Sequence, residues 1–112
     1  MKGFVYLAGP YTSNDENVRI ARFNLLTKKA ADLMLQGYVV YSPITHGHTI
    51  AEKYKLPVDF DWWRKQCFEM LRHSSKLFIL RLPGYQESIG VSEEITLALK
   101  LNIPIEYVDH ES

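Results

Sequence analysis

Short apolar runs alternate with longer amphipathic stretches along the chain. The apolar runs have the length and the β-branched or aromatic content of buried strands, and they lie at residues 3–8, 38–42, 76–82 and 104–108. The stretches between them repeat apolar residues at helical spacing, at about residues 12–37, 59–74 and 88–101. This alternation predicts a single α/β domain over residues 1–112, a small Rossmann-like or flavodoxin-like sandwich with a four- to five-stranded, mainly parallel sheet flanked by helices.

The segment between residues 44 and 57 has a mixed pattern. Residues 45–48, Thr-His-Gly-His, are typical of a loop, and residues 49–54 favour a short helical turn. We therefore expect a loop between the second strand and the next helix.

The composition narrows the expected partners. The 112 residues suit one domain, and 13 Lys and Arg balance 13 Asp and Glu. A neutral chain has no overall field that would draw it onto polymeric nucleic acid or an anionic membrane, so we expect a small-molecule ligand. The single cysteine, Cys67, excludes an intramolecular disulfide, and no apolar run approaches the roughly 20 residues of a membrane span. These features predict a cytoplasmic protein.

Residues that follow the strands are the first candidates for a site, because open parallel sheets bind ligands beyond the carboxyl ends of their strands. After the third strand, glycines and a serine precede a helix, with Ser88 and Gly90 near its start. Backbone N–H groups there can hold a phosphate, but the same residues also make a turn and a helix cap, so both interpretations stay open. Glu93 and Glu94 suit the first turns of a helix whatever their function, and spacing alone does not choose between them.

Histidines and arginines offer further candidates. His46 and His48 are either imidazoles that line a pocket or ordinary polar loop residues, because metal binding needs more ligands and none follow at a recognisable spacing. We expect no metal and no cofactor. Arg19 and Arg22, on the first predicted helix, either project toward the pocket mouth or form surface pairs with nearby acidic residues.

Aromatic residues gather near the start of the second amphipathic stretch. Phe60, Trp62 and Trp63 could stack on a base, although ordinary helix packing explains Trp63 without a ligand. Cys67 lies on the apolar stripe of the same stretch and is most simply a core residue.

Several segments follow one another in an order that is typical of one superfamily. They are residues 6–11 (Tyr-Leu-Ala-Gly-Pro-Tyr), Arg19, residues 22–23, residues 42–48 (Ser-Pro-Ile-Thr-His-Gly-His), residues 82–84, residues 88–91 and residues 94–95. With these segments, which span nearly the whole chain, the sequence resembles the nucleoside 2-deoxyribosyltransferase-like superfamily, especially its small phage and bacterial members of unassigned role.

The resemblance implies cleavage of an N-glycosidic bond in a nucleoside or nucleotide, with a glutamate that attacks the anomeric carbon of the sugar. The matching glutamate is Glu94, and Tyr6 matches a tyrosine that lies near the nucleophile and the sugar. Relatives are usually homo-oligomers, which implies a dimer or tetramer. The substrate-binding positions that follow from the match are Gly9, Pro10, Arg19, His46, His48, Asp59, Ser88 and Gly90.

Two positions depart from the family pattern. Cys67 stands where relatives commonly carry an aspartate, and Asp59 or another nearby carboxylate could approach from a neighbouring turn. Pro10 and Thr12 replace hydroxyl and arginine groups that bind phosphate in the deoxynucleoside monophosphate N-hydrolases. Either an arginine of the first helix supplies that charge, or the substrate has no 5′-phosphate.

Three functions therefore remain open. The first is the N-glycosidase or deoxyribosyltransferase, with hydrolysis favoured because the chain is short and residues 88–91 suit a phosphate. The second is a catalytically inactive module that senses or sequesters a nucleotide, which Cys67 supports. The third is a phosphoribohydrolase-like enzyme, whose Pro-Gly-Gly-x-Gly-Thr-x-x-Glu loop is matched only by Pro83, Gly84 and Glu94.

Overall fold

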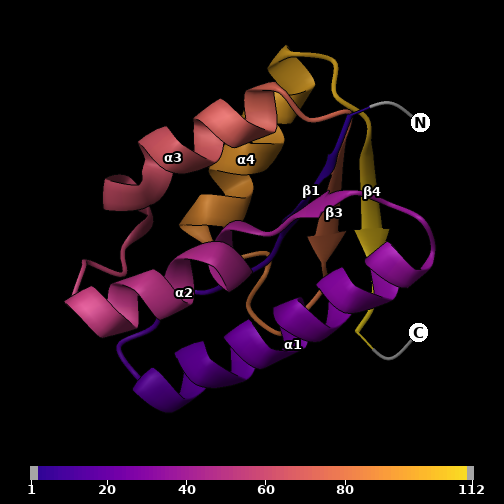
Figure 1. Cartoon of the computed structure of the whole chain (residues 1–112). Helices are drawn as coiled ribbons and strands as arrows, with labels where there is room; N and C mark the ends of the chain where they lie inside the picture. Colours follow the sequence, from indigo (N-terminus) through magenta and orange to yellow (C-terminus); the bar gives the residue numbers. More distant parts are fainter. Residues whose placement is uncertain (1–2, 111–112) are drawn as a thin grey trace.

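A computed structural model describes residues 3–110, which fold as layers of helices around one parallel sheet (Figure 1). The elements in chain order are β1 (Val5–Ala8), α1 (Glu16–Leu35), β2 (Val40–Tyr41), α2 (Pro43–Tyr54), α3 (Phe60–Arg72), β3 (Lys76–Leu80), α4 (Ile89–Lys100) and β4 (Ile105–Val108). The α/β alternation expected from the sequence is thus confirmed.

The sheet of the described residues has four strands in the order β2-β1-β3-β4, and every pairing is parallel. β1 and β3 occupy the centre and pair from Val5 with Lys76 to Ala8 with Ile79. The side chains of β1 are all buried, which is why this strand reads as a continuous apolar run instead of an alternating one. The predicted mainly parallel sheet is therefore wholly parallel over residues 3–110.

Two layers of side chains pack on the two faces of the sheet. On one face, Val5, Leu7 and Phe78 meet the buried stripe of α1, formed by Leu26, Ala30 and Leu33. On the other face, Tyr6, Ala8 and Ile79 meet residues of α3 and α4, among them Cys67, Leu71, Val91 and Ala98. Consecutive residues of β1 therefore serve opposite layers, so Tyr6 points toward α3 and α4.

Helix α1 starts at Glu16, later than the expected residue 12, and ends at Leu35, close to the expected end at Gly37. The side chain of Asp15 accepts a hydrogen bond from the backbone N–H of Asn17 at 2.9 Å and caps the helix. The chain leaves the helix through Gly37, whose φ of 101° is readily available only to glycine. Across residues 3–110, no helix has the length and apolar character that crossing a membrane requires.

The structure corrects the prediction for residues 44–57, because a helix, α2, starts directly at Pro43. Ser42 caps this helix by accepting a hydrogen bond from the N–H of Thr45 at 3.3 Å, and Pro43 suits the first helical turn. Gly47 weakens the helical pattern but lets the indole of Trp63 approach, since a Cβ atom there would lie 3.2 Å from that ring. β2 is correspondingly shorter than expected, at Val40–Tyr41.

Leu26 offers a test of the α1 layer because its side chain is wholly buried against the sheet. We expect Leu26→Ala to lower the free energy of unfolding by about 2–5 kcal/mol, through lost apolar contact and a residual cavity. Urea unfolding followed by circular dichroism measures this. The matched control is Leu35→Ala on the same helix, where the side chain is 87% exposed and the expected change is within about 0.5 kcal/mol. Equal losses in the two variants would contradict the packing described here.

Candidate functional site

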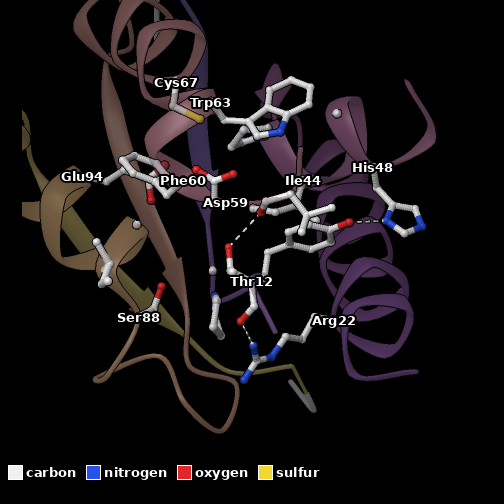
Figure 2. A pocket seen from close by; sticks show the side chains of 18 of the residues that line it. Thr12, Arg22, Ile44, His48, Asp59, Phe60, Trp63, Cys67, Ser88 and Glu94 are labelled. Carbon is white, nitrogen blue, oxygen red and sulfur yellow. Dashed lines mark hydrogen bonds between the residues drawn. The ribbon is translucent and has the colours of Figure 1, made fainter. Parts of the chain in front are cut away.

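A cavity of about 460 Å³ opens beyond the carboxyl ends of β1, β2 and β3 (Figure 2). It is bounded by the segments that follow these strands and by the first turns of α2, α3 and α4. Much of its wall is apolar, with side chains such as Pro10, Ile44, Ala51, Val58, Phe60 and Trp63. An enclosed apolar wall with a few polar groups is the usual form of a small-molecule site.

Glu94 contributes a carboxyl group to this cavity from the second turn of α4, although its residue is only 3% exposed. The hydroxyl of Tyr6, which lies behind the wall on β1 and is fully buried, donates a hydrogen bond to this carboxyl group. The two predicted residues, 88 positions apart in sequence, therefore meet at the cavity. Figure 2 shows Glu94 on the same side of the pocket as Cys67 and Phe60, across from His48.

Burial dominates the chemistry of this pair. It raises the pKa of Glu94 from 4.5 to about 8, and the negative charge of Glu93 adds to the rise while the Tyr6 hydrogen bond opposes it. The pKa of Tyr6 is raised well above its usual 10.0, first by burial and then by Glu94. The phenol consequently stays protonated and remains a hydrogen-bond donor to the carboxyl group throughout the physiological range.

Glu93 does not line the cavity, whereas Glu94 does, so the two neighbouring glutamates differ in their access to a ligand. Its carboxylate accepts two hydrogen bonds from the guanidinium of Arg64, at 2.8 and 2.7 Å. These hydrogen bonds lower the pKa of Glu93. Only Glu94 of the two therefore offers a carboxyl group to a ligand.

Cys67 lines the cavity beside Glu94 and is also a core residue, as the apolar stripe of its helix predicts. Burial, followed by the nearby carboxyl of Glu94, raises the pKa of the Cys67 thiol to about 12. The thiol therefore stays neutral. Asp59 lies in the wall as well, and its side chain caps α3 by accepting a hydrogen bond from the N–H of Trp62 at 3.2 Å.

Three predicted substrate-binding positions, Gly9, Ser88 and Gly90, follow β1 or lie at the start of α4. Ser88 accepts a hydrogen bond from the N–H of Val91 at 3.2 Å, so its hydroxyl caps α4. A Cβ atom on Gly90 would lie 2.8 Å from the ring of Phe60, and one on Gly9 would lie 2.8 Å from Leu26. The cap and the close packing thus account for these three residues locally, and all three also line the cavity.

Arg22 and His48 line the cavity, whereas Arg19 and His46 lie outside its wall. The Arg22 guanidinium donates hydrogen bonds to the carbonyls of Thr12 and Pro83, each at 3.2 Å. Arg19 instead donates to the carbonyl of Ser13. Of the two predicted arginines, only Arg22 is therefore placed to meet a ligand.

His46 and His48 point in different directions because they lie on helix α2 and not on the expected loop. Each residue of a helix is rotated by about 100° from the one before, so two side chains two positions apart lie on nearly opposite sides of the helix. His48 is 8% exposed, stacks on Phe23 and forms a 2.6 Å hydrogen bond with the hydroxyl of Tyr11. His46 is exposed and lies near the ring of Tyr41. Within residues 3–110, no three metal-ligating side chains gather in a way that could hold an ion.

Two features of the site were not predicted from the sequence. Phe60 and Trp63 line the cavity, while Trp62 is 48% exposed and does not, a distinction that depends on how α3 meets α2 and α4. The contact between Arg64 and Glu93 joins residues 29 positions apart, and no local pattern indicates it. Helical phase could have separated Trp62 from Trp63, because only Trp63 lies one turn before Cys67.

The buried carboxyl group of Glu94 gives the stability of the protein a pH dependence. The folded pKa of about 8 lies above the ordinary 4.5, so the folded state binds the extra proton between these values. The contribution of this group to stability is therefore greatest below about pH 4.5 and falls as the pH rises toward 8, by on the order of 5 kcal/mol in all.

We expect Glu94→Gln to remove most of this pH dependence and to be more stable than the parent at pH 8. Urea unfolding at pH 5, 6.5 and 8 measures the effect. Glu93→Gln is the matched control: its half-buried carboxylate pairs with Arg64 and has a lowered pKa, so this variant should keep most of the pH dependence that Glu94 causes. Parallel pH profiles of the parent and Glu94→Gln would contradict the burial of an uncharged carboxyl group.

Comparisons with known proteins give a family without a function. The sequence model of the family described as "Domain of unknown function (DUF1937)" matches residues 3–109. No curated protein matches the chain significantly. The matched range takes in every strand and helix and every residue of the cavity wall. The chain therefore belongs to the DUF1937 family.

Proposed function

We propose that the protein cleaves the N-glycosidic bond of a nucleoside or nucleoside 5′-monophosphate, with Glu94 as nucleophile and Tyr6 as its hydrogen-bonding partner. The observation that carries this proposal is the buried carboxyl of Glu94, held by Tyr6 in the wall of an apolar cavity at the ends of the strands. Burying a carboxyl group costs stability, and carboxyl groups buried in a cavity with a raised pKa are typical of catalytic sites.

The chemistry follows from the surroundings of the carboxyl group. In its ionised form, Glu94 attacks the anomeric carbon, and the electron pair of the broken C–N bond leaves with the base, which then gains a proton. The positive charge that develops on the sugar is stabilised by a poorly hydrated carboxylate more than it would be in water. Water, or a second base, then attacks the anomeric carbon of the glycosyl-enzyme and frees Glu94. Hydrolysis and base exchange thus share their first step.

The cavity wall has an apolar part that suits a base and polar side chains that suit a sugar and a phosphate. The rings of Phe60 and Trp63 and the aliphatic residues around them offer faces on which a base can pack. We assign the sugar to Glu94, and Arg22 is the only Lys or Arg that lines this pocket in the described part of the chain. These placements support a ligand with an aromatic ring, a sugar and an optional phosphate.

A nucleotide-binding module without catalysis is the second candidate, and Cys67 is the observation that favours it. Its thiol is neutral and stands beside Glu94, where the resembling superfamily commonly has an aspartate. A neutral thiol cannot accept or deliver charge as a carboxylate does. Tight binding of a nucleoside or nucleotide with no release of base would support this second function.

We expect the parent protein to release free base from at least one member of a panel of nucleosides, deoxynucleosides and their 5′-monophosphates. Glu94→Gln should lower the rate by roughly 1000-fold or more, because it removes the nucleophile while keeping the shape of the side chain. Chromatographic detection of free base measures the rate. Glu93→Gln, the neighbouring change on the same helix, should keep activity within about tenfold of the parent. Equal losses in both variants would exclude Glu94 as the nucleophile.

Variants of Arg22 test whether the substrate carries a 5′-phosphate. If the substrate carries one, Arg22→Met should lower kcat/KM for the monophosphate by about 10- to 100-fold, because a charged hydrogen bond contributes roughly 1.5–3 kcal/mol. The kcat/KM for the nucleoside should change by less than about threefold. Steady-state kinetics on a matched nucleoside and monophosphate pair measure this. Arg22→Lys keeps the charge, and Arg81→Met is the control, since Arg81 pairs with Asp109 outside the cavity wall. A similar loss for both substrates would place the phosphate elsewhere.

A further inference from the structure

Arg64 joins the start of α3 to α4 through two carboxylates. Its guanidinium donates to both oxygens of Glu93, at 2.8 and 2.7 Å, and lies 2.7 Å from a carboxylate oxygen of Asp61. The side chains of Arg64 and Glu93 are each 34% exposed, so the pair is partly shielded from water. We call these three residues the Arg64 clamp.

The clamp also fixes the aromatic wall of the cavity. The Arg64 guanidinium lies 5.5 Å from the centre of the Phe60 ring. That ring in turn packs so closely on Gly90 that a Cβ atom there would lie 2.8 Å from it. Arg64 therefore holds the first turn of α3 over the first turn of α4, where both helices border the cavity.

Charge connects the clamp to the candidate nucleophile. Glu93 directly precedes Glu94, and its negative charge opposes ionisation of the Glu94 carboxyl. Three other side chains interact electrostatically with the Glu94 carboxyl: Tyr6 from β1, Tyr41 from β2 and Cys67 from α3. All three are neutral and have raised pKa values. Asp59, Asp61 and Glu87 also line the cavity, but Glu93 is the neighbouring carboxylate whose charge raises the pKa of Glu94, and Arg64 pairs with it.

We propose that Arg64 is a positioning residue for Glu94: by neutralising Glu93 and holding α3 against α4, it allows the buried carboxyl of Glu94 to ionise. This inference rests on the proposed function for its catalytic meaning. The ionisation itself can be measured without any substrate.

The test compares two variants that break the same ion pair from opposite sides. Arg64→Met leaves Glu93 negative and should raise the pKa of Glu94 by about half a unit to one unit, whereas Glu93→Gln leaves Arg64 positive and should lower it. Carbon-13 NMR of labelled glutamate carboxyl groups follows the titration, with the Glu94 signal assigned by its loss in Glu94→Gln. The double variant Arg64→Met with Glu93→Gln should return close to the parent.

A clamp with a merely structural role would give a different result. Both single variants would then loosen the same contact and shift Glu94 in the same direction, and that outcome, or no shift in either, overturns the proposal. Arg72→Met is the matched control on α3, because Arg72 pairs with exposed Glu69 at 3.7 Å and should leave Glu94 unchanged. If Arg64→Met fails to fold, Glu93→Gln and Arg64→Lys test the proposal instead. Glu93→Gln must lower the pKa of Glu94, and Arg64→Lys must keep the pKa of Glu94 near the parent value.

A second readout ties the clamp to catalysis. At a pH well below the pKa of Glu94, a rise of one unit should reduce kcat/KM for base release about tenfold in Arg64→Met, and the acid limb of the pH profile should move by the amount seen in NMR. Opposite NMR shifts without any base release would reject the proposed function and keep the role of Arg64 in ionisation. Base release without opposite NMR shifts would support the proposed function and reject the role of Arg64 in the ionisation of Glu94.

Discussion

The site depends on one buried contact, in which the phenol of Tyr6 meets the carboxyl group of Glu94. Because Tyr6 lies on a central strand and is fully buried, its hydroxyl has a fixed position within the sheet. Glu94 can reach it only if α4 begins close to Ser88 and packs through Val91 against the same face. The loop after β3, the helix cap and the second core layer therefore all serve to bring a carboxyl group to the ends of the strands.

The fold was largely predictable because its central strands and longest helix carry strong local signals. β1 and β3 are apolar on both faces, and α1 has a polar cap, an apolar stripe and a glycine after its end. α2 was not predictable in the same way. Pro43, Gly47 and two histidines weaken its local pattern, and the contact of Trp63 on Gly47 that favours it comes from α3. Tertiary packing therefore decided the element that propensity left open.

The site was predictable as a place more than as a set of residues. The rule that ligands bind at the carboxyl ends of parallel strands correctly located the cavity. The family resemblance selected Glu94 over Glu93, and the structure gives a physical difference between them, one buried in the wall and the other paired with Arg64. Arg19 and His46 were expected in the pocket and lie outside its wall: the Arg19 guanidinium donates to the carbonyl of Ser13, and His46 lies on the side of α2 nearly opposite His48.

Cys67 changes the electrostatic balance of the site in two opposing ways. An aspartate beside Glu94 would add a second negative charge to a cavity where burial alone raises the pKa of Glu94 to about 8, and like charges would raise it further. A neutral thiol avoids that repulsion and so favours the ionised nucleophile. The same neutral thiol, however, can neither stabilise the positive charge that develops on the sugar nor exchange a proton with the departing base at neutral pH. In the proposed reaction Cys67 therefore adds no charge at the anomeric carbon, and catalysis depends on the ionisation of Glu94, which Tyr6 and Glu93 influence.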